Sequence, residues 1–295
     1  MRVGVVILPQ QPWAEQVHRW RRLEEWGFDH AWTYDHLSWR TLRDEPWFAT
    51  VPTLVAAATA TSRIRLGTWV ASPNFRHPVP FAKELMTLDD ISGGRFVLGV
   101  GSGGSGADAT VLGSPPLPLP ERTARFAEFV ELLDRLLRET STTWRGEHYA
   151  AEDARMLPGG PSEPRLPFVV AANGPRGMAL AARFGQGWAT TGPATGTPVE
   201  RWWDGVAEAS VRFGETLEAA GRAPGSVDRY LSVDAGAYAL ASVDEFLRTV
   251  DRAAGLGFTD VVTHWPRARG VYAGEESVLE AVAARLPSLR DPAAS

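Results

Sequence analysis

A run of glycines behind a short apolar segment is the first feature of this sequence that could bind a ligand. The stretch TLDDISGGRFVLGVGSGGSGAD, residues 87–108, has glycine at positions 99, 101, 103, 104 and 106. Backbone N–H groups beside glycine are open to an anion because no Cβ covers them. The letters also fit the dinucleotide fingerprint, but prolines follow where that motif needs a helix and a second strand. The stretch predicts an anion-binding turn, with a plain flexible loop as the alternative.

A second candidate anion site lies in AANGPRG, residues 171–177. Asn173 and Gly174 predict a turn, and Pro175 suits the first position of a helix. That helix would offer free N–H groups to an anion, with Arg176 nearby. An ordinary turn and helix start is the alternative for this segment alone. Two such sites in one chain predict a phosphorylated cofactor.

Two histidines follow strand-like segments and could serve as acid–base groups. Asp35-His36 and His264-Trp265 each end an apolar run. A histidine beside an aspartate can hold or relay a proton near neutral pH. The alternative is a capping aspartate and a structural histidine.

Other chemistries lack the residues that they require. The sequence has no cysteine, no His-Glu-x-x-His and no acidic cluster with ligand spacing, so we expect no bound metal. Its net charge of −5 argues against nucleic acid as a partner. No apolar run reaches the roughly 18 residues of a membrane span, and the first segment is too short for a signal peptide. These features predict a cytoplasmic protein without a membrane partner.

The segments between these motifs alternate in a regular order. Continuous apolar runs, typical of parallel strands buried on both faces, alternate with stretches of helical spacing. The predicted strands are 3–8, 30–34, 63–70, 95–100, 168–172, 187–191, 229–235 and 259–263, and the predicted helices are 14–26, 48–60, 80–91, 121–139, 176–184, 200–220, 243–256 and 277–286. Eight such units favour a (β/α)8 TIM barrel of the α/β class over an open doubly wound sheet.

We expect one barrel domain over residues 1–295, with an insertion after strand four over about 101–166. The insertion is expected at the carboxyl-end face and contains a predicted hairpin or loop near 142–151. Active sites of such barrels lie where the carboxyl ends of the strands meet. The glycine run, AANGPRG and both histidines follow strands, so the predicted fold brings them to one mouth.

Three segments resemble the bacterial-luciferase-like superfamily of flavin- and deazaflavin-dependent oxidoreductases. They are IRLGTWVASPNFRHP, TLDDISGGRFVLGVGSG and AANGPRGMALAARFGQGWAT. The family fold is a (β/α)8 barrel. In its coenzyme F420 branch an Asp-His pair lies beside the deazaflavin ring, which implies that His36 gives or takes a proton and that Asp35 orients it. A non-prolyl cis peptide backs the ring, and by position it falls at Trp69–Val70, which together with Thr68 would contact the cofactor.

The resemblance also implies which residues hold the cofactor phosphate. They are Gly101, Ser102, Gly103 and Gly104 after strand four, and Ala172, Asn173, Gly174 and Arg176 after strand five. The chain departs from the F420-dependent sugar-phosphate dehydrogenases in two ways. Those enzymes have a glutamate where this chain has Gly104, and they hold the sugar phosphate with lysines, whereas the only lysine here, Lys83, falls in a predicted helix. That activity is therefore not expected.

The implied function is hydride transfer between F420 and an organic substrate. Twelve tryptophans are many for this length, and they predict a large apolar or aromatic substrate. The predicted pocket residues are Trp13, Trp39, Trp188, Thr190, His264 and Trp265. The alternatives are an FMN-dependent monooxygenase that takes reduced flavin from a separate reductase, and a non-catalytic flavin-binding homologue. The family also implies a homodimer.

Overall fold

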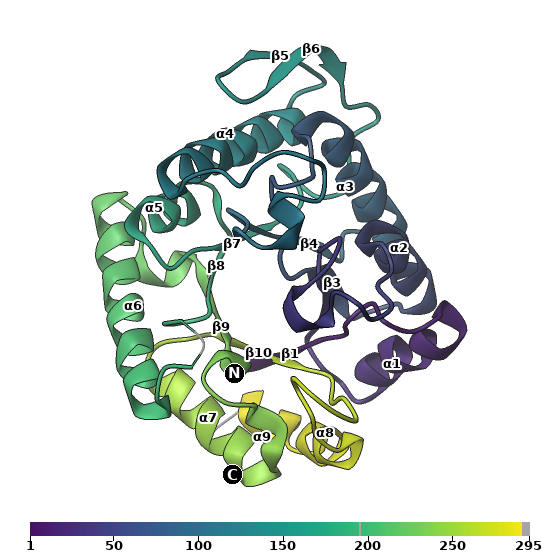
Figure 1. Ribbon diagram of the computed structural model, residues 1–295, viewed down its shortest axis with the longest axis vertical. Helices are drawn as coiled ribbons and strands as arrows, with labels where there is room; N and C mark the ends of the chain where they lie inside the picture. The colour runs from purple at the N-terminus through teal and green to yellow at the C-terminus, as the bar shows by residue number, and fades with distance from the viewer. Residues whose placement is uncertain (195, 291–295) are drawn as a thin grey trace.

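The computed structural model describes residues 1–194 and 196–290, and its centre is a closed barrel of parallel strands (Figure 1). The barrel strands are β1 (Arg2–Val6), β2 (His30–Thr33), β3 (Arg65–Thr68), β4 (Phe96–Gly101), β7 (Phe168–Ala171), β8 (Gly187–Thr190), β9 (Asp228–Ser232) and β10 (Asp260–His264). Around the barrel their order is β1-β10-β9-β8-β7-β4-β3-β2. All these neighbours pair in parallel, so the predicted TIM barrel is confirmed and the open sheet is wrong. The last five residues of the predicted domain, 291–295, lie outside the described residues.

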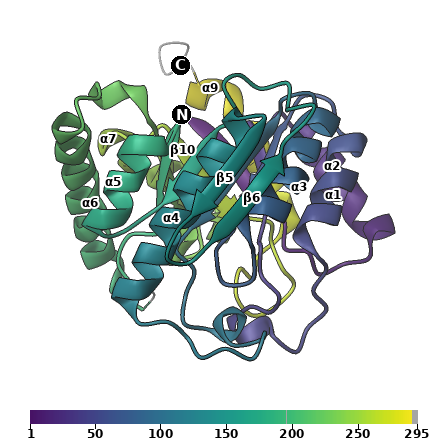
Figure 2. The ribbon, with the colours of Figure 1, turned by 90° about the horizontal axis from the view of Figure 1, so that it is seen from above.

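Helices cover the outside of the barrel (Figure 1). They are α1 (Trp13–Glu25), α2 (Thr50–Ala60), α3 (Pro78–Ser92), α4 (Leu119–Arg138), α5 (Pro175–Phe184), α6 (Val199–Ala219), α7 (Val243–Gly255), α8 (Glu276–Ala283) and α9 (Leu286–Arg290). Short 3-10 turns lie in the loops: η1 (Arg40–Leu42), η2 (Ala107–Ala109), η3 (Pro224–Ser226), η4 (Val233–Ala235) and η5 (Ala239–Ala241). The long loops gather on the face opposite the N-terminus (Figure 2). No helix in the described ranges is both long and apolar enough to cross a membrane.

Sequence signals at the ends of α3 show why the elements start and stop where they do. Pro78 takes the first helical turn, which its fixed φ favours. The His77 side chain accepts a hydrogen bond from the Val79 N–H at 3.2 Å and so caps the helix. The helix ends at Gly93, whose φ of 62° is left-handed. The chain can therefore turn back into β4 within a few residues.

The segment between β4 and β7 is not one insertion at the mouth, which corrects the sequence prediction. Its first part, residues 102–108, and the start of α4 reach the mouth, and α4 packs between α3 and α5 as the barrel's own helix. The antiparallel hairpin of β5 (Ser141–Arg145) and β6 (Ala150–Arg155) lies on the outer side of α4 (Figures 1 and 2). The Glu128 carboxylate of α4 holds it by accepting hydrogen bonds from Trp144 Nε1 (3.0 Å) and the Tyr149 N–H (2.9 Å). The hairpin thickens the outer wall and does not shape the mouth.

Two apolar cores follow from the alternation of side chains along the strands. The larger core lies between strands and helices and includes Trp20, Phe81, Phe129, Phe168 and Trp188. The smaller core fills the barrel and includes Val6, Trp32, Tyr34, Trp69 and Tyr230. Neighbouring residues of one strand thus belong to different cores, and this decides which predicted residues reach the site.

Asp260 anchors the amino-terminal end of the barrel. Its carboxylate is fully buried and accepts hydrogen bonds from Arg2 Nε (2.8 Å) and Nη2 (2.7 Å), with His30 Nε2 at 3.0 Å. Burial raises the pKa of Asp260, but these hydrogen bonds outweigh burial and lower the pKa to about 2. The carboxylate is therefore charged in the folded protein at all but the lowest pH.

This low pKa makes stability depend on pH. Because the pKa of Asp260 is higher in the unfolded chain, its contribution is complete above about pH 4 and is lost as the pH falls toward 2. In urea unfolding we expect this group to cost the wild type roughly 2–3 kcal/mol between pH 5 and pH 2. Asp260→Asn should remove that part of the slope, and Glu215→Gln, at an exposed site on α6, should keep it. An unchanged slope in Asp260→Asn would assign the acid sensitivity to other carboxylates.

Candidate active site

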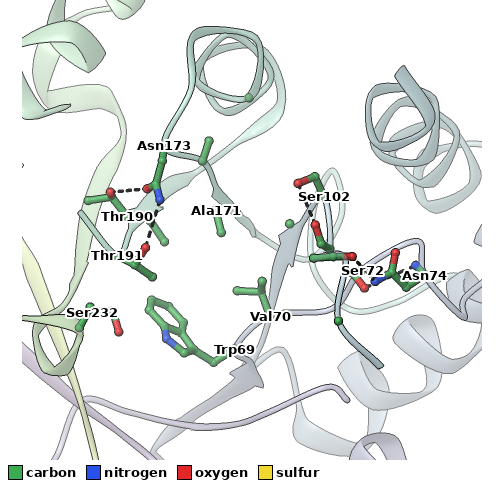
Figure 3. A pocket seen from close by; sticks show the side chains of 18 of the residues that line it. Trp69, Val70, Ser72, Asn74, Ser102, Ala171, Asn173, Thr190, Thr191 and Ser232 are labelled. Atoms are coloured by element: carbon green, nitrogen blue, oxygen red, sulfur yellow. Dashed lines mark hydrogen bonds between the residues drawn. The ribbon is translucent and has the colours of Figure 1, made fainter. Parts of the chain in front are cut away.

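The mouth of the barrel holds a cavity of about 1120 Å³. Its walls come from the loops after β2, β3, β4, β7, β8, β9 and β10 and from the start of α4. Figure 3 shows Ser72, Asn74 and Ser102 on one side and Asn173, Thr190 and Thr191 on the other, with Trp69, Val70 and Ala171 between them. Small-molecule sites are typically about 300–1,000 Å³, so this cavity has room for a cofactor together with a substrate.

The glycine run enters this cavity, and its glycines have different roles. A Cβ at Gly99 would overlap the Thr68 carbonyl oxygen, so this glycine allows β4 to approach the end of β3. Gly103 adopts a left-handed φ of 72°, and a Cβ there would lie 2.8 Å from the Asn74 side chain. The walls include all four residues of the predicted phosphate loop, Gly101, Ser102, Gly103 and Gly104. Part of the glycine pattern thus serves the protein's own packing, and cofactor binding by this loop stays a prediction.

The chain that follows β3 forms part of the cavity wall. The Trp69–Val70 peptide bond is cis, as the resemblance implied, and both residues line the cavity. Thr68, also predicted to contact the cofactor, does not line it. Its side chain is fully buried, and its hydroxyl donates to the Gly99 carbonyl at 2.7 Å.

The second predicted anion site follows β7, the strand next to β4, and lines the cavity at the start of α5 (Figure 3). All four residues predicted for this site line the cavity: Ala172, Asn173, Gly174 and Arg176. No side chain in the described ranges caps α5, so the N–H groups of its first turn are available to an anion. The Asn173 amide is itself fixed, because Nδ2 donates to the Thr191 hydroxyl (3.1 Å) and Oδ1 accepts from Thr190 (2.7 Å). The two predicted anion sites therefore follow neighbouring strands, β4 and β7, which pair at Gly101 and Ala171, and both line one cavity.

His36 lines the cavity, and its carboxylate partner is Asp108. His36 Nδ1 is hydrogen-bonded to Asp108 Oδ2. Asp108 Oδ1 accepts hydrogen bonds from the N–H groups of Leu37 (2.9 Å) and Ser38 (3.1 Å). One carboxylate thus fixes both the imidazole and the turn that carries it. Within the described residues His36 Nε2 has no hydrogen-bond partner, which leaves it for a ligand in the cavity.

Electrostatics keep Asp108 charged beside this imidazole. Burial raises the pKa of Asp108, but the hydrogen bonds from His36 and from the two backbone N–H groups outweigh burial and lower the pKa below its usual range. Sequence reasoning missed Asp108, which lies 72 residues from His36. The only sequence feature that could have indicated Asp108 was its position at the end of the glycine run.

Asp35 does not orient His36, which corrects the role implied by the resemblance. The Asp35 side chain is 1% exposed and forms two hydrogen bonds with Arg76, Nε to Oδ2 at 2.6 Å and Nη2 to Oδ1 at 2.7 Å. Asp35 is absent from the cavity wall, whereas Tyr34 and His36 line it. The physical reason is alternation, since adjacent side chains of an extended chain point to opposite faces.

The tryptophans divide in the same way. Trp188 and Trp265, predicted to line the substrate pocket, belong to the core between strands and helices, and Trp13, predicted likewise, is partly buried and packs against this core. Trp188 stacks on a phenylalanine of α6 at 4.4 Å between ring centroids, and Trp265 on the tryptophan that ends α1 at 5.9 Å. None of the three lines the cavity, so the structure does not place them where the sequence predicted. Trp39 and Thr190 do line the cavity.

His264 lies directly behind the wall of the cavity. It is 1% exposed, with Nδ1 at 2.7 Å from Asp234 Oδ2 and Nε2 at 2.7 Å from the Tyr34 hydroxyl. Asp234, Tyr34 and Tyr272 separate it from the ligand space and line the wall themselves. Sequence reasoning missed all three. Tyr34 had a signal, because it is two residues before His36, but Tyr272 had none.

The fold and the mouth together define a class of protein. A parallel (β/α)8 barrel with a carboxylate-supported histidine and two predicted anion-binding backbone segments at its carboxyl-end mouth is typical of barrel enzymes with a phosphorylated ligand. The sequence matches the luciferase-like monooxygenase family over residues 1–254. The chain belongs to this family.

The chain is similar in sequence to curated relatives and in fold to solved structures. The F420-dependent glucose-6-phosphate dehydrogenase of Beutenbergia cavernae is 39% identical over 198 residues, which cover 66% of this chain and 57% of that protein. The 4-hydroxyprotoasukamycin monooxygenase of Streptomyces nodosus subsp. asukaensis is 32% identical over 234 residues, 74% of this chain and 61% of that protein. The coenzyme F420-dependent tetrahydromethanopterin reductase of Methanopyrus kandleri has a TM-score of 0.79 at 19% identity, covering 98% of this chain and 99% of that one, and this likeness shows the fold. The chain thus spans about three fifths of the length of these curated relatives.

Proposed function

We propose that this protein is an F420-dependent oxidoreductase that transfers a hydride between the deazaflavin and a large apolar or aromatic organic substrate. The observation that carries the proposal is that His36, oriented by Asp108, lines the same cavity as the glycine loop and the uncapped start of α5. The names of the relatives support F420 as the cofactor. A homodimer and a cytoplasmic location are parts of the same proposal, the first tested by sedimentation.

The residues of the cavity fit such a cofactor. The loop around Gly103 and the first turn of α5 with Arg176 would hold its phosphate. The cis peptide segment Trp69–Val70 would contact its ring. When bound, the deazaflavin supplies the donor or acceptor of the hydride. His36 would give or take a proton at Nε2, while Asp108 keeps the imidazole oriented through Nδ1.

An aromatic wall supports an apolar or aromatic substrate. Tyr34, Trp39 and Tyr272 line the cavity together. Lys83 is exposed on α3, donates to the Leu157 carbonyl at 3.3 Å and does not line the cavity. We therefore propose that sugar phosphates, the substrates in the names of several relatives, are not the substrates of this chain.

The deciding experiment titrates the purified protein with F420 and, separately, with FMN, while intrinsic tryptophan fluorescence is followed. Tight binding of F420 with weak binding of FMN supports the proposal. The reverse supports the FMN-dependent monooxygenase with its separate reductase. Binding of neither cofactor contradicts both, and F420 binding without turnover of any screened substrate supports the non-catalytic homologue.

Substitutions on α5 test the phosphate site in the same titration. We expect Arg176→Ala to weaken F420 binding about tenfold, because it removes a charged hydrogen-bond donor from the cavity wall. Arg183→Ala is the matched control, because Arg183 lies on the same helix but is exposed and paired with Glu131. Equal affinities for both variants would place the phosphate elsewhere.

A further inference from the structure

A chain of four hydrogen-bonded side chains lies in the cavity wall and directly behind it. Asp234 Oδ2 lies 2.7 Å from His264 Nδ1, and His264 Nε2 lies 2.7 Å from the Tyr34 hydroxyl. The Tyr34 hydroxyl lies 3.0 Å from the Tyr272 hydroxyl, and both tyrosines line the cavity. Three separate parts of the sequence supply these residues. The function proposed above uses the rings of Tyr34 and Tyr272 as part of an aromatic wall, but it does not use this chain of hydrogen bonds.

Counting hydrogens fixes the direction of this chain. The Asp234 oxygens accept from the N–H groups of Ala239 (2.9 Å) and His264 (2.8 Å), so they act as acceptors and His264 Nδ1 donates to them. A neutral imidazole then accepts at Nε2, and the Tyr34 hydroxyl donates to it. Tyr34 has no second hydrogen, so the Tyr272 hydroxyl donates to Tyr34. The Tyr272 oxygen therefore keeps a lone pair for a donor in the cavity.

The loop after β10 holds Tyr272 firmly in place. Tyr272 has a φ of 60°, a left-handed conformation that is uncommon for a residue other than glycine. Its ring stacks on that of His264 with 3.7 Å between centroids and 5° between planes, and its carbonyl accepts from the Arg267 N–H at 2.9 Å. Arg267 in turn pairs with Glu45 at 2.6 Å, which ties this loop to the loop after β2. Rigid support of this kind is what a group that must meet a substrate atom requires.

Resting on the hydride transfer proposed above, we propose that Tyr272 is a catalytic residue that takes the hydroxyl proton of an alcohol substrate, or returns it to a carbonyl in the reverse reaction. During oxidation the substrate carbon loses a hydride, with its electron pair, to the deazaflavin, while the O–H bond breaks and C=O forms. The hydroxyl proton passes to Tyr272, the Tyr272 proton to Tyr34, and the Tyr34 proton to His264 Nε2. Asp234 stabilises the resulting imidazolium. Tyr34, His264 and Asp234 are positioning residues, because they act through Tyr272.

The two acid–base groups of the cavity have separate tasks. The His36 and Tyr34 rings meet edge to face at 5.5 Å between centroids, and no hydrogen bond links them within the described residues. His36 would handle the proton that accompanies hydride transfer to the cofactor, and Tyr272 the proton of the substrate hydroxyl. Burial raises the pKa of Tyr272 to about 12, so its hydroxyl is protonated near neutral pH, as a relay through O–H groups requires.

Phenylalanine substitutions remove the hydroxyls and keep the rings. With F420 and 1-phenylethanol as probes, we expect Tyr272→Phe and Tyr34→Phe to lower kcat about 100-fold with little change in KM. Tyr238→Phe is the matched control, because the Tyr238 hydroxyl donates to the His264 backbone carbonyl (3.0 Å) and lies outside the relay. An unchanged kcat in Tyr272→Phe overturns the inference. So does wild-type protein that binds F420 but converts neither 1-phenylethanol nor acetophenone, whereas failure to bind F420 overturns the proposed function instead.

A second measurement needs neither cofactor nor turnover. Side-chain ¹⁵N spectra of the cofactor-free protein report the tautomer of each of its six histidines, and His264→Gln assigns the resonances of His264. We expect a neutral Nδ1–H tautomer for His264, with an Nε2 resonance that moves in Tyr34→Phe and stays in Tyr238→Phe. An Nε2–H tautomer would reverse the chain and leave no base behind Tyr272, which overturns the inference.

Discussion

Replacing His36 with asparagine is expected to lower kcat of F420-linked turnover about 1,000-fold and to leave F420 affinity within about threefold. The reason is geometric, since His36 lines the cavity and its Nε2 has no hydrogen-bond partner among the described residues, while Nδ1 is held by Asp108. A loss of this size is about 4 kcal/mol of transition-state stabilisation. Steady-state kinetics measure the rate, and fluorescence titration measures cofactor binding.

Two further variants separate the chemistry from the fold. Asp108→Asn should lower kcat less, about 10- to 100-fold, because the imidazole stays but loses its charged partner. His18→Asn, on the exposed side of α1, should change nothing. If His36→Asn instead abolishes F420 binding at an unchanged unfolding free energy, His36 is a binding residue. If it retains full turnover, another group of the cavity is the acid or base.

The barrel could be predicted because its signals are local. A strand buried on both faces is a short apolar run wherever it occurs, and a covering helix has its own periodicity. The predicted strand 30–34 corresponds to His30–Thr33, and the predicted helix 243–256 to Val243–Gly255. Parallel order then follows from the alternation itself, because each helix must return the chain to the same end of the barrel.

The placement of the segment between β4 and β7 could not be predicted in this way. Its helix resembles any other amphipathic helix, and only contacts with α3 and α5 make it the barrel's own. The hairpin position depends on one carboxylate of α4, Glu128, which binds Trp144 and Tyr149 across the intervening turn. Such contacts join residues far apart in the sequence, and neither composition nor periodicity encodes them.

The candidate site was predictable where a motif is contiguous and unpredictable where it is assembled. The glycine run and AANGPRG are local motifs, and the structure brings both to one cavity. The partner of His36 comes from another loop, and the Asp234–His264–Tyr34–Tyr272 chain joins separate segments. Proximity of that kind is a property of the closed barrel.

The alternation of side chains along the strands was the signal that could have improved the prediction of the site residues. At the end of β10 His264 points into the barrel, and Trp265, the next residue, points out of it. In β8 Trp188 points out. The same rule places His36 inside and Asp35 outside. A period of two is strict within a strand, so one inward residue assigns its neighbours. The type of a residue suggested its chemistry, but its inward or outward direction along the strand decided whether it could reach the cavity.

Replacing Asp35 with asparagine is expected to lower the free energy of unfolding by about 3 kcal/mol rather than to impair the chemical step. Asp35 is buried and bonded twice to Arg76, whose guanidinium also lies over the Phe81 ring at 4.3 Å. Burial lowers the pKa of Arg76, but its carboxylate partners outweigh burial and raise it, so the guanidinium keeps its charge. Without Asp35 that charge would remain in an apolar setting with only the partly exposed Glu84 as a partner. Urea unfolding at pH 7 measures the loss.

An exposed ion pair supplies the control for Asp35. Glu152→Gln breaks the pair with Arg145, whose side chains are both 69% exposed, and should change stability by less than about 0.5 kcal/mol. The double variant Asp35→Leu/Arg76→Met should recover much of the loss, because it leaves no buried charge without a partner. If Asp35→Asn keeps full stability and F420 binding but loses turnover, then Asp35 acts in the reaction despite facing away from the cavity. If stability alone falls, the Asp-His motif has divided into a structural aspartate and an acid–base histidine, and Asp108 is the carboxylate that serves the histidine.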